Sequence, residues 1–423
     1  MSDHVISIIV LVLVFVVATA FSVHMGALAL VAAFVVGTAI AGKSTDGIFS
    51  GFPGDLFVVL VGVTFLFAIA RNNGTVDWLV HRCMRAVGGR TALIPWAMFL
   101  VTALLAGVGA VVPAAVGIIA PIGMGVARRY GISPLLMGIF IANGGSAGGF
   151  SPIGVFGTIT NDIVIRNHIP GSPTLLFLYS LIFNILLNLA AFALFGGRQL
   201  LGRRGEVPAP ADAGGTQAAA TEVPPKLDAN RALTLIGLLA LVCGALFFDL
   251  DVGLMALSVA VVLSLVSPQY AKNAAEMCAW STVLLVCGIV TYVNLMERIG
   301  TIDYLGDRVA SIHAPLPAAL LICFIGAIVA AFASTTGILG ALIPLAVPFL
   351  LSGQVAAVPL VAALAICASV VDASPFSTSG ALVTANASDD ERNLVFRRLM
   401  VWGFSLVAVV PLVTWGVLVA PGW

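Results

Sequence analysis

Long apolar runs, each near the length of a membrane-spanning helix, follow one another along almost the whole chain. The first three are residues 5–21, 27–40 and 56–70, separated by short polar segments. Because roughly 20 apolar residues in a helix cross the hydrocarbon core of a bilayer, this pattern predicts an all-α polytopic membrane protein. Counting the later runs in the same way predicts about ten transmembrane helices.

Two other apolar stretches, residues 92–126 and 316–351, are interrupted by Gly, Pro or hydroxyl residues. The first contains Pro113 and Pro121, and the second contains Pro344. Proline inside a helix removes a hydrogen bond and breaks or kinks the helix. We therefore expect each stretch to form a re-entrant helical hairpin that enters and leaves the membrane on the same side.

Two further spans, residues 135–165 and 357–386, are predicted to be broken helices. The first contains N-G-G-S-A-G-G-F-S-P-I-G-V-F-G-T from residue 143, and the second contains A-S-V-V-D-A-S-P-F-S-T-S-G-A-L-V-T from residue 368. Non-helical backbone at membrane depth must be buried in protein or line a cavity, and opened helix ends bind small ions. The alternative is that Gly145 and Gly149 form an ordinary helix-packing face. A similar break in each half favours a binding site.

The chain also contains an internal repeat. Residues 74–79 (G-T-V-D-W-L) match residues 300–305 (G-T-I-D-Y-L), and the predicted elements follow in the same order in each half. Residues 201–230, rich in Ala, Gly and Pro, are expected to form a disordered linker. The predicted repeats are therefore residues 1–200 and 231–423. Because each contains an odd number of crossings, the two repeats must be inverted relative to each other.

Composition and charge agree with this class and indicate an orientation. Hydrophobic residues make up 60% of the chain and charged residues 9%, and the mean hydropathy is +1.12. With the N-terminus outside, 15 of the 19 Lys and Arg residues lie on the cytoplasmic side. The positive-inside rule therefore predicts a multi-pass protein of the cell (inner) membrane with both termini outside and a cytoplasmic linker. No nucleic-acid partner is expected.

The candidate binding residues are small or carry hydroxyl or amide groups, and they lie at the broken helices and the second hairpin. Neither broken helix contains Lys or Arg, so helix N-termini, hydroxyls and bound cations would have to hold an anion. A single hydroxyl more commonly bonds to a carbonyl one turn earlier, but clustering at a break favours binding. The predicted substrate-binding residues are Asn143, Gly144, Gly145, Ser146, Ser151, Pro152, Thr335, Thr336, Ser374, Pro375, Ser377 and Thr378.

A sodium ion is predicted to bind at Ser146, Ser334, Thr335 and Asp372. Hydroxyl, carbonyl and carboxylate oxygens are hard ligands that suit such a cation. Asp372 lies in an apolar segment, where an acidic side chain is a functional candidate by default. It could bind a cation, carry a proton or cap the half-helix after the break, and the sequence leaves these roles open.

The motifs of membrane enzymes are absent from the sequence. An intramembrane protease or a prenyl transferase would need H-E-x-x-H, paired intramembrane aspartates or an Asp-rich metal motif. We therefore expect a protein that is not an enzyme and has no cofactor, with Na⁺ or H⁺ as the coupling ion. A channel is another alternative, but two inverted hairpins around one central site favour alternating access.

These motifs resemble the ion transporter superfamily, whose divalent-anion/sodium symporters have inverted repeats, re-entrant hairpins and Ser-Asn-Thr motifs at the hairpin tips. S-P-I-G and S-P-F-S stand where those symporters have Gly-Thr-Pro-Pro-type turns, and residues 334–336 (S-T-T) stand at the Ser-Asn-Thr place of the second hairpin. The run N-G-G-S-A-G-G-F-S-P-I-G is similar to that of malonate-type dicarboxylate carriers. The first hairpin departs from the pattern, with residues 111–113 (V-V-P) in place of Ser-Asn-Thr.

The resemblance implies a secondary active transporter of a small dicarboxylate, similar to malonate or succinate and coupled to a cation, with Na⁺ as the first choice. The alternative is a proton-coupled organic-anion symporter or a cation/proton antiporter of the same superfamily. The expected partners are a small anionic substrate and the lipid bilayer, and the sequence leaves open whether the protein is a monomer or a homodimer.

Overall fold

The computed structural model describes residues 3–21, 23–88, 90–203, 227–248, 250–301, 304, 315–331, 335–351 and 355–421. Within these ranges the secondary structure is helical and contains no β-strand element. The prediction of an all-α fold is confirmed. Most of the predicted linker lies outside the described residues, and so does Ser334.

The helices follow the order of the apolar runs. Those of the first half are α1 (Asp3–Phe21), α2 (Met25–Val35), α3 (Thr45–Phe49), α4 (Gly54–Asn72), α5 (Thr75–Ala86), α6 (Ile94–Gly107), α7 (Val112–Tyr130), α8 (Pro134–Gly149), α9 (Val155–Arg166) and α10 (Pro173–Leu194). Those of the second half are α11 (Ala229–Phe247), α12 (Val252–Val266), α13 (Pro268–Ala271), α14 (Trp280–Arg298), α16 (Pro315–Ala330), α17 (Thr335–Leu351), α18 (Ala357–Val370), α19 (Thr378–Ala385) and α20 (Asp389–Thr414). Short π-helical segments extend α2 to Ile40 and α20 to Val419.

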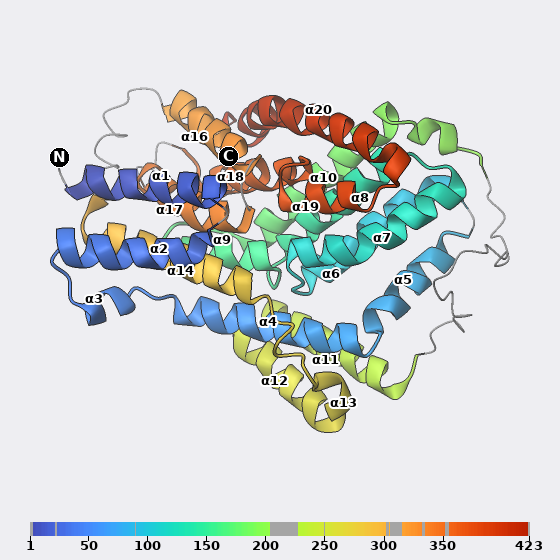
Figure 1. Ribbon diagram of the computed structural model, residues 1–423, viewed down its shortest axis with the longest axis horizontal. Helices are drawn as coiled ribbons and strands as arrows, with labels where there is room; N and C mark the ends of the chain where they lie inside the picture. Colours follow the sequence, from blue (N-terminus) through green and yellow to red (C-terminus); the bar gives the residue numbers. More distant parts are fainter. Residues whose placement is uncertain are drawn as a thin grey trace.

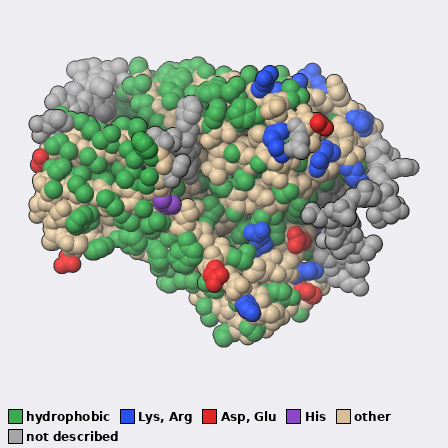
Figure 2. Space-filling model, viewed as in Figure 1, with side chains coloured by type: hydrophobic (Ala, Val, Ile, Leu, Met, Phe, Trp, Pro, Cys, Tyr) green, Lys and Arg blue, Asp and Glu red, His purple; other side chains and the backbone are tan. Residues whose placement is uncertain are grey.

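The length and composition of these helices suit a membrane. In the described part of the chain, six helices are long and apolar enough to cross a bilayer, and seven shorter apolar helices accompany them. Hydrophobic side chains cover much of the face in Figure 2, and most of the visible Lys and Arg gather toward the end that α5 and α7 occupy in Figure 1. The protein is therefore a multi-pass membrane protein. The count of ten spans stays a prediction.

Two short helices, α8 and α18, lie in the interior of the molecule (Figure 1). Residues 135–149 of α8 are all buried, and α6 packs extensively against this helix. The contact requires glycine, because a Cβ atom on Gly144 would lie 2.5 Å from the carbonyl oxygen of Phe99. A Cβ atom on Gly148 would likewise lie 1.9 Å from that of Ala103. The glycines of α8 thus allow its backbone to lie directly against the backbone of α6.

Each half of the chain packs a long helix against the other half. α4 packs against α12, and α14 packs against α2, as Figure 1 also shows. At the first crossing a Cβ atom on Gly62 would lie 2.6 Å from the carbonyl oxygen of Gly253. At the second crossing a Cβ atom on Gly288 would lie 2.1 Å from that of Gly26. The two crossings use the same kind of glycine pair, with the roles of the halves exchanged.

The repeated glycine motif makes a second pair of matching contacts. Gly74 and Gly300 have φ values of +75° and +74°, a left-handed conformation that glycine adopts without steric cost. The side chain of Arg231, from α11, lies against Gly74, and that of His4, from α1, lies against Gly300. In each half, therefore, this turn contacts the first helix of the other half.

Replacing Gly288 by valine should destabilise the protein, because the added side chain meets the carbonyl group of Gly26. We expect the free energy of unfolding to fall by about 1–3 kcal/mol, the usual cost of overpacking. The matched control is Gly125→Val in α7, where a Cβ atom would meet nothing within 4 Å. Thermal unfolding of the purified variants measures the difference, and equal midpoints would contradict the close crossing.

Candidate functional site

The first interruption lies between α8 and α9, at residues 150–154 (F-S-P-I-G). The sequence predicted a break somewhere within residues 143–158. In the structure residues 143–149 continue α8, so that only the part around Ser-Pro leaves the helical path. The N-terminus of α9 then begins inside the protein, where Val155 is buried.

Packing explains why the glycine-rich part of this stretch remains helical. Gly144 and Gly148 face α6, whereas Cβ atoms on Gly145 and Gly149 would lie 2.7 and 2.9 Å from the Val112 side chain of α7. Contact on two sides offsets the usual cost of glycine in a helix, which is about 1 kcal/mol per residue. Gly144 and Gly145, which the sequence predicted to bind substrate, thus lie in helix–helix contacts.

The second interruption lies between α18 and α19. α18 ends at Val370, a short 3₁₀ turn covers Val371–Ala373, and residues 374–377 (S-P-F-S) lead into α19. The Ser377 hydroxyl lies 2.6 Å from the carbonyl oxygen of Ser374 and accepts from the backbone N–H of Gly380 at 3.4 Å. Ser377 is therefore the residue that caps α19.

In both interruptions a serine hydroxyl forms a hydrogen bond to a backbone carbonyl of a neighbouring segment. The Ser151 hydroxyl donates to the carbonyl oxygen of Gly107 at the end of α6. The Ser374 hydroxyl donates at 3.2 Å to the carbonyl oxygen of Ala331, directly after α16. In each half the serine of the Ser-Pro pair thus binds the backbone where the first helix of the preceding helix pair ends.

A glycine six positions after each of these serines completes the shared geometry. A Cβ atom on Gly157 would lie 2.0 Å from the carbonyl oxygen of Ser151, and one on Gly380 would lie 1.9 Å from that of Ser374. No other residue type fits so close to backbone. The common pattern is therefore Ser-Pro with a glycine six positions after the serine. The sequence analysis did not identify this pattern.

Residues from three segments meet at the end of α18. The Ser146 hydroxyl, from α8, donates to the carbonyl oxygen of Ser369 at 3.2 Å. The Thr335 hydroxyl, at the start of α17, donates to the carbonyl oxygen of Ala368 at 3.3 Å. Carbonyls in the last turn of a helix have no partner within it and carry its partial negative charge. This end of α18 therefore concentrates oxygen atoms that can attract a cation.

Asp372 lies directly beyond this helix end and is 3% exposed. One carboxylate oxygen, Oδ2, accepts a hydrogen bond from the Ser379 hydroxyl in the first turn of α19. The other, Oδ1, is buried and has no hydrogen-bond partner among the described residues. A buried oxygen without a partner is uncommon and calls for an explanation, of which an absent ion or proton is one.

The corresponding region of the first half is apolar. Val112 is fully buried against the glycine face of α8, where Thr335 stands in the second half. Asn143, one turn before Ser146, points to a different helix and donates to Oδ1 of Asn188 on α10 at 2.8 Å. Among the described residues, the second interruption therefore has more side-chain oxygens around it than the first.

α10 carries a buried polar stripe that the sequence analysis missed. Ser180, Asn184 and Asn188 are all fully buried and occur every fourth residue, which places them on one face of the helix. Asn184 Oδ1 and Asn188 Nδ2 have no partner within the part of the chain that the structure describes. The spacing of four within an apolar run is the sequence signal that could have identified this stripe.

The structure thus gathers some predicted residues and separates others. Ser146, Thr335, Asp372, Ser374 and Ser377 lie around the end of α18 and the second interruption. Thr378 is exposed, and the buried hydroxyl of that turn belongs to Ser379. The remaining predicted residues are Asn143 facing α10, Ser151 and Pro152 in the first interruption, Thr336 buried in α17, and Pro375 buried in the second interruption.

Two protein families match the chain, one in each half. Residues 1–149 match the family described as dicarboxylate carrier protein MatC N-terminus, and residues 246–421 match the family described as citrate transporter. The search of curated proteins found no match.

Both families consist of transporters, so the prediction that the chain is a transporter rather than an enzyme is confirmed. Together the two matches support the resemblance of the chain to the ion transporter superfamily and to its malonate-type dicarboxylate carriers.

The hydrogen bond between Asn143 and Asn188 should couple the stabilities of α8 and α10. In a double-mutant cycle with alanine at both positions we expect a coupling of about 0.5–1.5 kcal/mol, as for other hydrogen bonds between membrane helices. The control cycle pairs Asn143 with Asn184, whose amide donates within its own helix to the carbonyl oxygen of Ser180. Denaturant unfolding of the variants measures both couplings. Additive effects at Asn143 and Asn188 would show that the two side chains do not interact.

Proposed function

We propose that the protein is a secondary active transporter of a small dicarboxylate, similar to malonate or succinate, and that Na⁺ is the coupling ion. The proposal rests on one observation. The two interrupted helices, α8 and α18, contact each other in the protein interior through the hydrogen bond from Ser146 to Ser369. The matches to a dicarboxylate carrier family and a citrate transporter family support the choice of a carboxylate substrate.

Helix ends would hold the anion. α9 and α19 start within the protein at the two interruptions, and they pack against α17 and α7 respectively. The N-terminus of a helix carries partial positive charge and free N–H groups, which favour carboxylates. Residues 143–158 and 368–384 contain no Lys or Arg. A substrate with two negative charges therefore needs a cation nearby, and this requirement couples the two solutes.

The cation would bind at the end of α18. Ser146, Thr335 and Asp372 supply two hydroxyls and a carboxylate, and the last carbonyls of α18 supply further oxygens. Such hard oxygen ligands suit Na⁺. Ser334, which the sequence also predicts as a ligand, lies outside the described residues. The unpartnered Oδ1 of Asp372 also supports the alternative of proton coupling, as symport or as cation/proton antiport.

Alternating access would follow from an inverted repeat. The exchanged helix pairs α4–α12 and α14–α2 support this arrangement of residues 1–200 and 231–423 on either side of the linker at 201–230. We place both termini outside and the linker in the cytoplasm, on the basis of the Lys and Arg distribution. A single cysteine introduced at Ala218 should react only from the cytoplasmic side, and reaction from outside would reverse the orientation.

Uptake into proteoliposomes tests the proposed function directly. Radiolabelled malonate or succinate should accumulate when an inward Na⁺ gradient is imposed, and unlabelled dicarboxylate should compete. A proton gradient alone should drive accumulation only if the coupling ion is H⁺. Transport of neutral sugars or amines without competition from dicarboxylates would refute the proposal.

Asp372→Asn separates the roles of this carboxylate, because it keeps the shape and removes the charge. If Asp372 binds Na⁺, the Na⁺ concentration for half-maximal uptake should rise about tenfold or more, equivalent to about 1.4 kcal/mol of lost binding. If Asp372 carries a proton, uptake should lose its dependence on pH. The control is Asp251→Asn, which alters an exposed carboxylate that caps α12.

Unchanged uptake with unchanged Na⁺ and pH dependence in Asp372→Asn would remove Asp372 from the mechanism. The hydroxyls of Ser146 and Thr335 would then be the remaining described side chains for the cation.

A further inference from the structure

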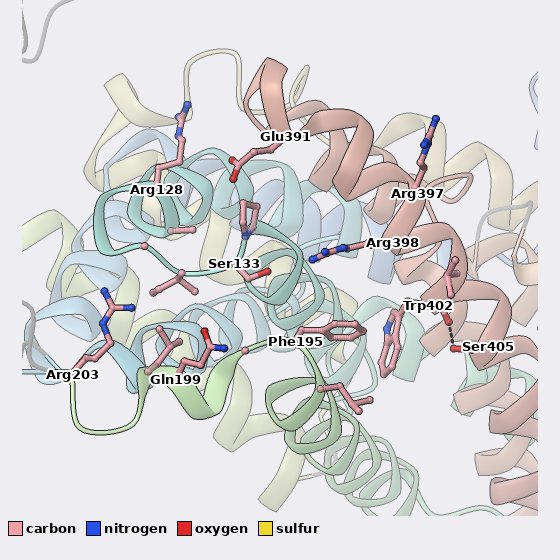
Figure 3. A pocket seen from close by; sticks show the side chains of 18 residues that line it. Arg128, Ser133, Phe195, Gln199, Arg203, Glu391, Arg397, Arg398, Trp402 and Ser405 are labelled. Atoms are coloured by element: carbon pink, nitrogen blue, oxygen red, sulfur yellow. Dashed lines mark hydrogen bonds between the residues drawn. The ribbon is translucent and has the colours of Figure 1, made fainter.

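A cavity lies at the other end of α8 from the interruption. It has a volume of about 960 Å³ and is bounded by the end of α7, the start of α8, the end of α10 with the segment that follows it, and the N-terminal half of α20 (Figure 3). Ser133, at its wall, precedes Ser146 by 13 positions along the same helix, which corresponds to roughly 20 Å. The cavity is therefore separate from the proposed transport site.

The cavity is strongly basic. Arg128, Arg203, Arg397 and Arg398 line it, and among the described lining residues Glu391 is the only acidic one. Within the described part of the chain, none of these four arginines forms an ion pair, since both recorded pairs involve Arg166. The carboxylate of Glu391 instead accepts from the Ser388 hydroxyl at 2.7 Å. The lining thus retains uncompensated positive charge that suits an anionic group.

An unpartnered donor lies in the same wall. Trp402 is only 8% exposed, lines the cavity, and its buried indole N–H has no hydrogen-bond partner among the described residues. Its ring packs edge-on against Phe195, with the centroids 5.2 Å apart. Figure 3 shows Arg398 extending toward Ser133, whereas Arg397 points elsewhere. A guanidinium group and an indole N–H in the wall of one cavity are suitable donors for a phosphate.

An apolar groove continues from this cavity along the same two helices. The groove has a volume of about 510 Å³ and runs between α10 and α20, lined by residues such as Ile182, Leu186, Ala190, Val409 and Val413. α10 lines the groove at Ala190 and the basic cavity at Leu194, one turn later. α20 lines the cavity at Ser405 and the groove at Leu406. The basic cavity and the apolar groove therefore adjoin each other.

We propose that this composite site binds an anionic phospholipid, with the phosphate of its head group in the basic cavity and an acyl chain in the groove between α10 and α20. A basic cavity beside an apolar groove suits an amphiphile, because a soluble anion has no apolar chain that could occupy the groove. Basic pockets between membrane helices on the cytoplasmic side are suited to anionic head groups. The predicted orientation places these arginines on that side.

Native mass spectrometry of the purified full-length protein, titrated with lipid, tests the basic cavity. Phosphatidylglycerol should be retained at least about fivefold more tightly than phosphatidylcholine with the same acyl chains, the effect expected for one net charge at a basic site. Arg398→Gln should weaken retention of phosphatidylglycerol about fivefold, and Trp402→Phe should weaken it less. The matched control is Arg198→Gln, which removes an exposed arginine of the neighbouring turn that does not line the cavity.

A second pair of variants tests the groove without altering charge. Ala190→Phe fills the groove and should weaken retention of phosphatidylglycerol, whereas Leu189→Phe, one residue away and outside the lining, should not. Thermal midpoints near that of the unmodified protein would show that each variant is folded. Equal retention of the two lipids, or equal effects of Arg398→Gln and Arg198→Gln, would overturn the proposal.

Competition with a free anion distinguishes a lipid site from a site for a soluble anion. Displacement of phosphatidylglycerol by millimolar inorganic phosphate, together with no effect of Ala190→Phe, would assign the cavity to a soluble anion and refute the lipid site. The readout is lipid retention and not uptake, so its outcome is independent of whether the protein transports dicarboxylates.

Discussion

A backbone group that leaves a helix in apolar surroundings must find a new partner, and this requirement underlies both interruptions. The partners come from serine hydroxyls and from helix ends. Ser151 reaches the end of α6, Ser374 reaches the residue after α16, and Ser377 caps α19. Proline contributes by having no N–H to satisfy. The polar residues at the centre of this protein are therefore needed for the fold as well as for any binding.

Glycine makes the arrangement compact. Helices that approach to backbone contact gain van der Waals energy, the main source of attraction between helices in lipid. Gly148 allows this for α6 and α8, and Gly62 and Gly288 allow it for the two crossings between the halves. The same residue type thus serves in straight helices and at sharp turns, which makes a glycine-rich stretch ambiguous when it is read alone.

That ambiguity limits what the sequence predicts. The all-α fold class follows from the lengths of the apolar runs, and the location of both Ser-Pro interruptions follows from proline. Both are local properties of the sequence. The helical state of residues 143–149 does not, because it depends on Val112 and on α6, which pack against the glycines only in the folded protein. The exposure of Thr378 depends on the rotation of α19, and the contact of Asn143 with Asn188 on the placement of α10. Tertiary packing decides each of these.

The serine bonds of the two interruptions also have a mechanical consequence. Separating Ser151 from Gly107, or Ser374 from Ala331, would leave polar groups unpaired in apolar surroundings, at about 1–3 kcal/mol for each group. α6–α7 with α8–α9 therefore form one stiff body, and α16–α17 with α18–α19 form another. Among the described residues, one side-chain hydrogen bond, from Ser146 to Ser369, joins the two bodies. Movement of one body against the other would break this bond, and a solute bound beside it would contact both bodies at once.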